Sequence, residues 1–177
     1  MRRTRRSGAG SELKAQATPK SAPAWAWSLG TWFGSGLSPF ASGSAGTAAT
    51  LPLVALLGLA LPSMPRWSPW CLVAALLLFY PGVLAGTLIE RATGRHDDGK
   101  IVVDEAVGTL LSFSFLSPQA FHHPWVYFLG FFLFRAIDVW KPWVVGYAQL
   151  LPRGWGVMMD DVLGGLAIGI IMFFVAK

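Results

Sequence analysis

The sequence predicts an all-α membrane protein: a multi-spanning helical bundle with about five membrane-embedded helices, some of them short and partly inserted. Composition is the first observation, because the 177 residues are 54% apolar, with a mean hydropathy of +0.52. Charged residues make up only 13% of the chain, against roughly 25% in soluble domains. The nine tryptophans all lie at the ends of long uncharged runs or between them, where indole rings favour the headgroup layer.

The chain divides into a polar, basic segment over 1–23, expected to be a disordered tail, and a membrane-embedded domain over 24–177. Residues 47–61 predict a short first helix, and residues 70–89 predict a second of bilayer length. The uncharged run 106–134 is broken at 117–118 and 122–124, which predicts two helices joined by a turn. Residues 162–176 predict the fifth helix. The pairs Gly82/Gly86 and Gly165/Gly169 favour close helix packing.

The basic residues predict both an orientation and a class of partner. The tail alone accounts for the net charge of +5, so the domain lacks the basic face of a nucleic-acid-binding protein. With the tail in the cytoplasm and five spans, every Lys and Arg except Arg66 and Lys177 falls on the inner side. This strong positive-inside bias places the connections 90–105 and 135–161 in the cytoplasm.

The same topology places all the acidic residues of the domain on the inner side, although acids play no part in the orientation rule. They are Glu90, Asp97, Asp98, Asp104, Glu105, Asp138, Asp160 and Asp161. Carboxylates at helix N-termini are also favoured by capping and by the helix dipole. So many negative charges near one low-dielectric surface would nevertheless repel one another. A hard divalent cation would remove that cost, and carboxylate oxygens suit magnesium.

Glycines, hydroxyls and two cations accompany these acids. Gly43, Ser44, Gly46 and Thr47 lie in a loop that enters the first predicted helix, where backbone N–H groups can bind an anion; a flexible linker is the alternative. Arg135, Asp138 and Lys141 are spaced to share one helical face. The two cations are therefore candidates to bind phosphate, with ion pairing to Asp138 or snorkelling to headgroups as alternatives.

Four blocks of sequence resemble the phosphatidylglycerophosphatase A family. They read GSGLSP with GxxG over 34–46, HDDGKIVVDEAVG over 96–108, FRAIDVWKP over 134–142 and GWGVMMDDVLGG over 154–165. The resemblance implies a small, multihelical, magnesium-dependent enzyme of the bacterial cytoplasmic (inner) membrane. It further implies hydrolysis of the terminal phosphomonoester of phosphatidylglycerophosphate in the cytoplasmic leaflet, which gives phosphatidylglycerol and phosphate.

The hypothesis that joins the two lines of reasoning assigns a role to each candidate residue. Asp104, Glu105, Asp160 and Asp161 hold one or two magnesium ions, and Asp138 completes or orients that set. The metal would polarise the phosphate and activate water. Arg135, Lys141 and the N–H groups of 43–47 would bind phosphate oxygens, and Asp97 or Glu90 would act as general base. A phosphatase for another lipid phosphate is the nearest alternative. An ion- or proton-coupled carrier would instead place an acid in mid-span.

Overall fold

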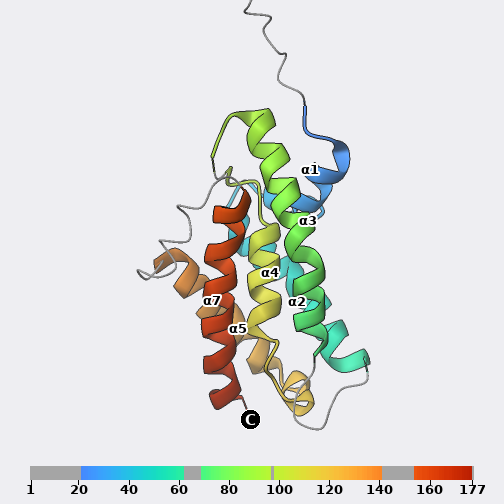
Figure 1. The fold of residues 1–177 in the computed structure, drawn as a ribbon. Helices are drawn as coiled ribbons and strands as arrows, with labels where there is room; N and C mark the ends of the chain where they lie inside the picture. Colours follow the sequence, from blue (N-terminus) through green and yellow to red (C-terminus); the bar gives the residue numbers. More distant parts are fainter. Residues whose placement is uncertain (1–20, 62–68, 97, 141–153, 177) are drawn as a thin grey trace, which may run out of the picture.

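A computed structural model describes residues 21–61, 69–96, 98–140 and 154–176 of the chain, and helices account for most of them (Figure 1). The elements, in chain order, are α1 (Ala24–Gly30), η1 (Ser35–Leu37), α2 (Ser42–Ala60), α3 (Trp70–Thr93), α4 (Val103–Ser112), η2 (Pro118–His122), α5 (Pro124–Trp140) and α7 (Gly154–Val175). The all-α prediction is confirmed for the described residues. Most of the predicted tail, residues 1–20, lies outside them.

Three described helices are long and apolar enough to cross a membrane: α2 with 19 residues, α3 with 24 and α7 with 22. The structure thus supports three of the five predicted membrane helices. The helix predicted from residue 106 corresponds to α4, which has 10 residues and a length of about 15 Å, half of a bilayer core. The second half of that run forms α5, which has 17 residues.

Helix α4 lies at the centre of the bundle, with α3 and α7 beside it (Figure 1). All of its residues except Glu105 are buried. Helices α4 and α7 begin at the same end of the bundle and run in the same direction, while α3 runs toward that end (Figure 1). We call this end, which carries Asp104, Glu105 and Asp161, the acidic end.

Glycines bring α7 into backbone contact with its neighbours. A Cβ atom on Gly165 would lie 2.3 Å from the carbonyl oxygen of Gly108, and one on Gly169 would lie 2.8 Å from that of Leu111. Similarly, a Cβ atom on Gly154 would lie 2.4 Å from the carbonyl oxygen of Val83 in α3. The predicted packing role of Gly165 and Gly169 is confirmed, because no larger residue fits at these crossings.

Helix α2 begins at the acidic end, five residues before the predicted start. Its first residue, Ser42, follows Ala41 in the left-handed region (φ 46°) and donates its hydroxyl to the carbonyl of Gly99 at 2.6 Å. The predicted glycine loop is therefore the first turn and a half of a helix. The N–H of Val102 donates to the carbonyl of Gly30 at 2.8 Å, which ties the segment before α2 to the connection between α3 and α4.

Candidate active site

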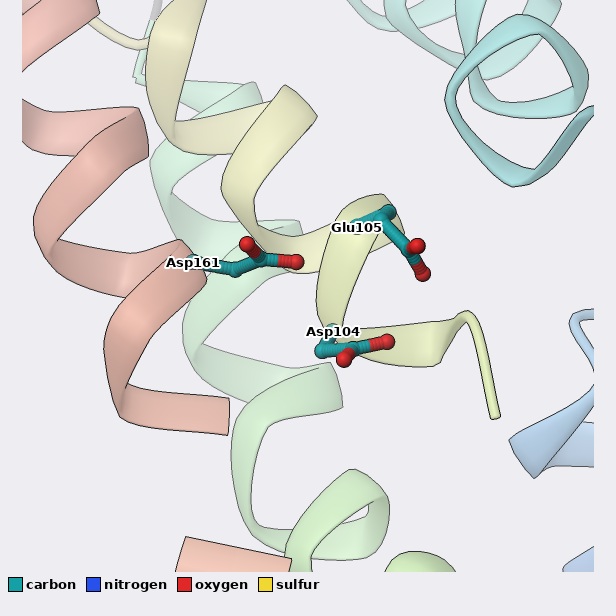
Figure 2. Close-up of side chains that lie close together, drawn as sticks. All are labelled: Asp104, Glu105 and Asp161. Atoms are coloured by element: carbon teal, nitrogen blue, oxygen red, sulfur yellow. The ribbon is translucent and has the colours of Figure 1, made fainter. Parts of the chain in front are cut away.

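Three carboxylates from two helices meet at the acidic end of the bundle. Asp104 and Glu105 lie in the first turn of α4, and Asp161 extends toward them from α7 (Figure 2). One carboxylate oxygen from each lies within 4.8 Å of the others. The predicted convergence of the two acidic doublets is thus confirmed for Asp104, Glu105 and Asp161, and Asp160 is not among the three. We call these three residues the acidic cluster.

The cluster is buried, and its charges are poorly compensated. Asp104 and Asp161 are 7% and 4% exposed, and the Oδ1 atom of Asp104 and the Oε2 atom of Glu105 are buried with no hydrogen-bond partner among the described residues. Burial, together with the charges of Glu105 and Asp160, raises the pKa of Asp104 well above its usual range. Burial and the charge of Asp161 raise the pKa of Glu105 to about 8.

These orphaned oxygens fit a divalent metal ion. Two buried acceptors need a positive partner, and an all-carboxylate donor set suits a hard cation such as magnesium rather than zinc or copper. Asp104, Glu105 and Asp161 are therefore the residues that could hold the ion.

Asp160 is placed differently from its neighbour. Its Oδ1 atom accepts a hydrogen bond from the backbone N–H of Asp161 at 2.9 Å, and it is 3% exposed. The sequence predicted that the last helix begins at residue 162, directly after this doublet. Helix α7 instead begins at Gly154, so the doublet lies almost two turns inside it. Capping and the helix dipole, which act within the first turn, do not account for two acids at this depth.

Arg135 supplies positive charge beside the cluster. Its Nη1 atom lies 2.5 Å from Oδ2 of Asp138 and 3.9 Å from Oε1 of Glu105. The ion pair with Asp138, which the sequence offered as an alternative to phosphate binding, is present, and the same guanidinium also reaches the acidic cluster. The charge of Arg135 acts against the rise in the pKa of Glu105.

Gly43, in the first turn of α2, lies directly against this pair. A Cβ atom at residue 43 would lie 2.3 Å from Oε1 of Glu105 and 2.8 Å from Nη1 of Arg135. The start of α2 has no side-chain cap, and the N–H groups of a first helical turn carry partial positive charge. Anion-binding groups of two kinds, a guanidinium and a helix N-terminus, therefore lie next to the carboxylates.

The other predicted phosphate-binding residues vary in position. The buried hydroxyl of Thr47 donates to the carbonyl of Gly43 at 3.0 Å, and a Cβ atom on Gly46 would meet the side chain of Val102 at 2.8 Å. Ser44 is half-buried in the same turn as Gly43. Lys141, and the proposed general base Asp97, lie outside the described residues.

Two other polar residues bear on the site. Glu90, the other candidate base, is 8% exposed near the end of α3. Sequence reasoning missed Thr109, whose buried hydroxyl has no hydrogen-bond partner among the described residues. Thr109 follows Glu105 by four residues on α4, a spacing that places two side chains on one helical face. This four-residue spacing is the feature of the sequence from which Thr109 could have been predicted.

Comparisons with known proteins give the family. The family model for phosphatidylglycerophosphatase A matches residues 28–176. The chain is 32% identical over 152 residues to phosphatidylglycerophosphatase A of Escherichia coli (strain K12), covering 83% of this chain and 81% of that protein. It is 32% identical over 150 residues to the protein of the same name from Haemophilus influenzae, covering 82% and 85%.

A third relative carries a different name. A protein of Bacteroides thetaiotaomicron, provisionally named phosphatidylinositol-3-phosphatase, is 36% identical over 141 residues, covering 78% of this chain and 85% of its own. No solved structure matches the chain significantly. Because the family model spans most of the sequence and includes every residue of the acidic cluster, the chain belongs to the phosphatidylglycerophosphatase A family of phosphatases.

Proposed function

We propose that this protein is a magnesium-dependent phosphatidylglycerophosphatase of the bacterial inner membrane. It hydrolyses the terminal phosphomonoester of phosphatidylglycerophosphate to phosphatidylglycerol and phosphate. The observation that carries the proposal is the buried acidic cluster of Asp104, Glu105 and Asp161, with orphaned oxygens on two of its members. Its position beside Arg135 and the start of α2 supports a phosphate as the bound group.

In this proposal the acidic cluster holds magnesium. Asp160 orients Asp161, whose backbone N–H donates a hydrogen bond to the Asp160 side chain. A bound magnesium ion would supply positive charge to the phosphoryl oxygens and lower the pKa of water. Water is the preferred nucleophile, because an Asp-x-Asp motif for a phospho-aspartate is absent from the sequence. Asp138 holds the guanidinium of Arg135 in place.

The cationic and N–H groups beside the acidic cluster would bind the phosphate oxygens. Arg135 donates from its guanidinium, whose planar donors match phosphate geometry, and the N–H groups of Gly43 and Ser44 donate from the helix start. Gly46 and Thr47 complete that turn, and Lys141 adds a further cation. Phosphoryl transfer requires little more than such positioning and charge neutralisation. Asp97 or Glu90 takes the proton of the attacking water.

The proposed membrane arrangement would put this chemistry at headgroup depth. Three candidate spans support insertion, and we propose that α4 and α5 complete a set of five membrane-embedded helices. The concentration of Lys and Arg in the tail and in the connections 90–105 and 135–161 supports a cytosolic position for the acidic end. There a lipid phosphomonoester of the cytoplasmic leaflet reaches the acidic cluster while its acyl chains stay in the bilayer.

Phosphate release by the purified full-length protein in detergent tests the proposal. With phosphatidylglycerophosphate and magnesium we expect turnover that a chelator abolishes and that added magnesium restores. Asp104→Asn and Asp161→Asn should be inactive at saturating magnesium, while Glu12→Gln, outside the family-matched residues 28–176, should retain activity. Full activity in both Asn variants would remove the metal-ligand assignment.

Phosphatidylinositol 3-phosphate is a second candidate substrate, and the observation that suggests it is the name of the Bacteroides thetaiotaomicron relative. The same cluster and the same Arg135 could receive an inositol phosphomonoester. Comparing kcat/KM for phosphatidylglycerophosphate and phosphatidylinositol 3-phosphate with the same preparation decides between the two. We expect the glycerol phosphate lipid to be preferred.

A further inference from the structure

An apolar cleft lies between α3 and α7, with α4 as its floor. It encloses about 250 Å³, and its lining has no polar surface. We call it the α3–α7 cleft. Its main lining residues are Leu76 and Phe79 on α3, Val107 and Leu111 on α4, and Val162 and Leu166 on α7.

The cleft begins next to the acidic cluster. Val107 and Leu111 follow Asp104 at the third and seventh positions, so the three residues share one stripe of α4. On the opposite wall, Val162 directly follows Asp161. On α7 the cleft lies alongside the level of Asp161, from Met159, and it extends toward the other end of the bundle.

The cleft is open to the side. Leu76, at its mouth, is 66% exposed, whereas Val107 and Leu111 on the floor are 1% and 5% exposed. Phe79 and Trp155 meet edge to face, with ring centroids 5.8 Å apart, at the acidic end of the mouth. In the proposed membrane arrangement, with α3 and α7 as spans, the mouth would face hydrocarbon and Trp155 would lie in the headgroup layer, which indole rings favour.

We propose that the α3–α7 cleft binds an acyl chain of the phospholipid whose phosphate occupies the acidic cluster. The inference rests on the proposed function and adds a binding site for the apolar part of the substrate. From Met159 to Leu166 on α7 the cleft spans about 10 Å, which lies within the roughly 15 Å of one leaflet. A slot this narrow, without polar lining, suits a flexible hydrocarbon chain and offers nothing that would orient a polar ligand.

Photocrosslinking of the full-length protein tests the site without relying on turnover. The probe is phosphatidylglycerophosphate with a diazirine midway along one acyl chain, in phosphatidylglycerol vesicles with chelator present. Since the floor is buried, lipid that merely surrounds the bundle does not reach α4. We expect labelling at Val107 and Leu111 that an excess of unlabelled substrate reduces. Labelling confined to outward residues such as Leu77 and Ile170, which are 71% and 56% exposed, would overturn the proposal.

A matched pair of variants tests the site by kinetics. Leu76 lines the mouth and its neighbour Leu77 does not, although both are exposed. We expect Leu76→Trp to lower the ratio of turnover on the long-chain lipid to turnover on its deacylated headgroup about tenfold, the loss expected when two methylene groups are no longer buried. Leu77→Trp should leave the ratio unchanged.

Leu166→Phe, which fills the cleft from α7, provides a second variant and should lower the same ratio. Equal loss on both substrates, or equal ratios for the Leu76 and Leu77 variants, would overturn the proposal. If the wild-type protein hydrolyses neither substrate, the proposed function fails. Labelling of α4 then still decides whether the cleft holds an acyl chain.

Discussion

The two acidic doublets, Asp104–Glu105 and Asp160–Asp161, are alike in sequence and differ in their surroundings. Helix α4 is enclosed by its neighbours, so both side chains of its doublet join the acidic cluster. In the second doublet only Asp161 does so, and Asp160 accepts a hydrogen bond from the backbone N–H of Asp161. The first doublet therefore contributes two carboxylates to the acidic cluster and the second contributes one.

The sharpest test of this difference compares the two residues of the second doublet. Asp161→Asn should lower kcat about 1000-fold, because losing a metal ligand removes several kcal/mol of charge stabilisation. Asp160→Asn should lower it only about tenfold, since the amide oxygen can still accept the hydrogen bond from the N–H of Asp161. Steady-state kinetics at saturating magnesium measure both effects. Equal losses would contradict the separate roles.

Arg135 lies between the first doublet and the start of α2. The variant Arg135→Lys tests whether its planar guanidinium is needed, or only its positive charge. The ammonium keeps the charge and loses the planar pair of donors that matches phosphate. We expect KM to rise about tenfold, the loss of one charge-assisted hydrogen bond of about 1.5 kcal/mol. The kcat value should change less. A fall in kcat with an unchanged KM would show that Arg135 acts on the metal ligands instead of on the substrate.

Gly43→Ala asks whether α2 must approach the first doublet so closely. The added Cβ atom would collide with Glu105 and Arg135, so we expect a several-fold fall in kcat/KM. The matched control is Gly99→Ala, whose Cβ atom meets nothing within 4 Å. Unchanged kinetics in both variants would contradict the close approach of α2.

The pH dependence of stability reports on the first doublet without substrate. The folded-state pKa of Glu105 is about 8, above its ordinary value of 4.5, so between these values the folded protein binds more protons than the unfolded chain. Stability should therefore decrease as the pH rises from about 5 to 8. With chelator present, we expect the melting temperature to fall by roughly 5 °C over that range. Magnesium should restore it at the upper end, and a flat profile would argue against a buried carboxylate cluster.

The sequence was sufficient to predict which charged residues form the site. Carboxylates of distant segments fell on one membrane face once the basic residues had set the orientation, and Asp104, Glu105 and Asp161 indeed meet. The ion pair between Arg135 and Asp138 followed from helical spacing. The sequence offered no way to know that the same guanidinium reaches Glu105, because that contact joins α4 to α5.

Helix boundaries were less predictable, for a physical reason. Glycine and serine disfavour helix interiors, so the sequence from residue 42 predicts a loop. Its helix is stabilised by contacts that need small residues, such as that between Gly46 and Val102. The sequence predicts that the last helix begins at residue 162, because Asp160 and Asp161 resemble a water-exposed boundary. The helix instead begins at Gly154, and both acids are buried within it.

The contact between Gly108 and Gly165 sets the register of the metal site. Sliding α7 along α4 by one helical turn would displace Asp161 by about 5.4 Å, too far to share an ion whose ligands lie about 2.1 Å away. The close backbone contact between Gly108 and Gly165 opposes such a slip. Thinning or tilting of the surrounding bilayer would therefore move the two helices as one rod and leave the spacing of the carboxylates unchanged.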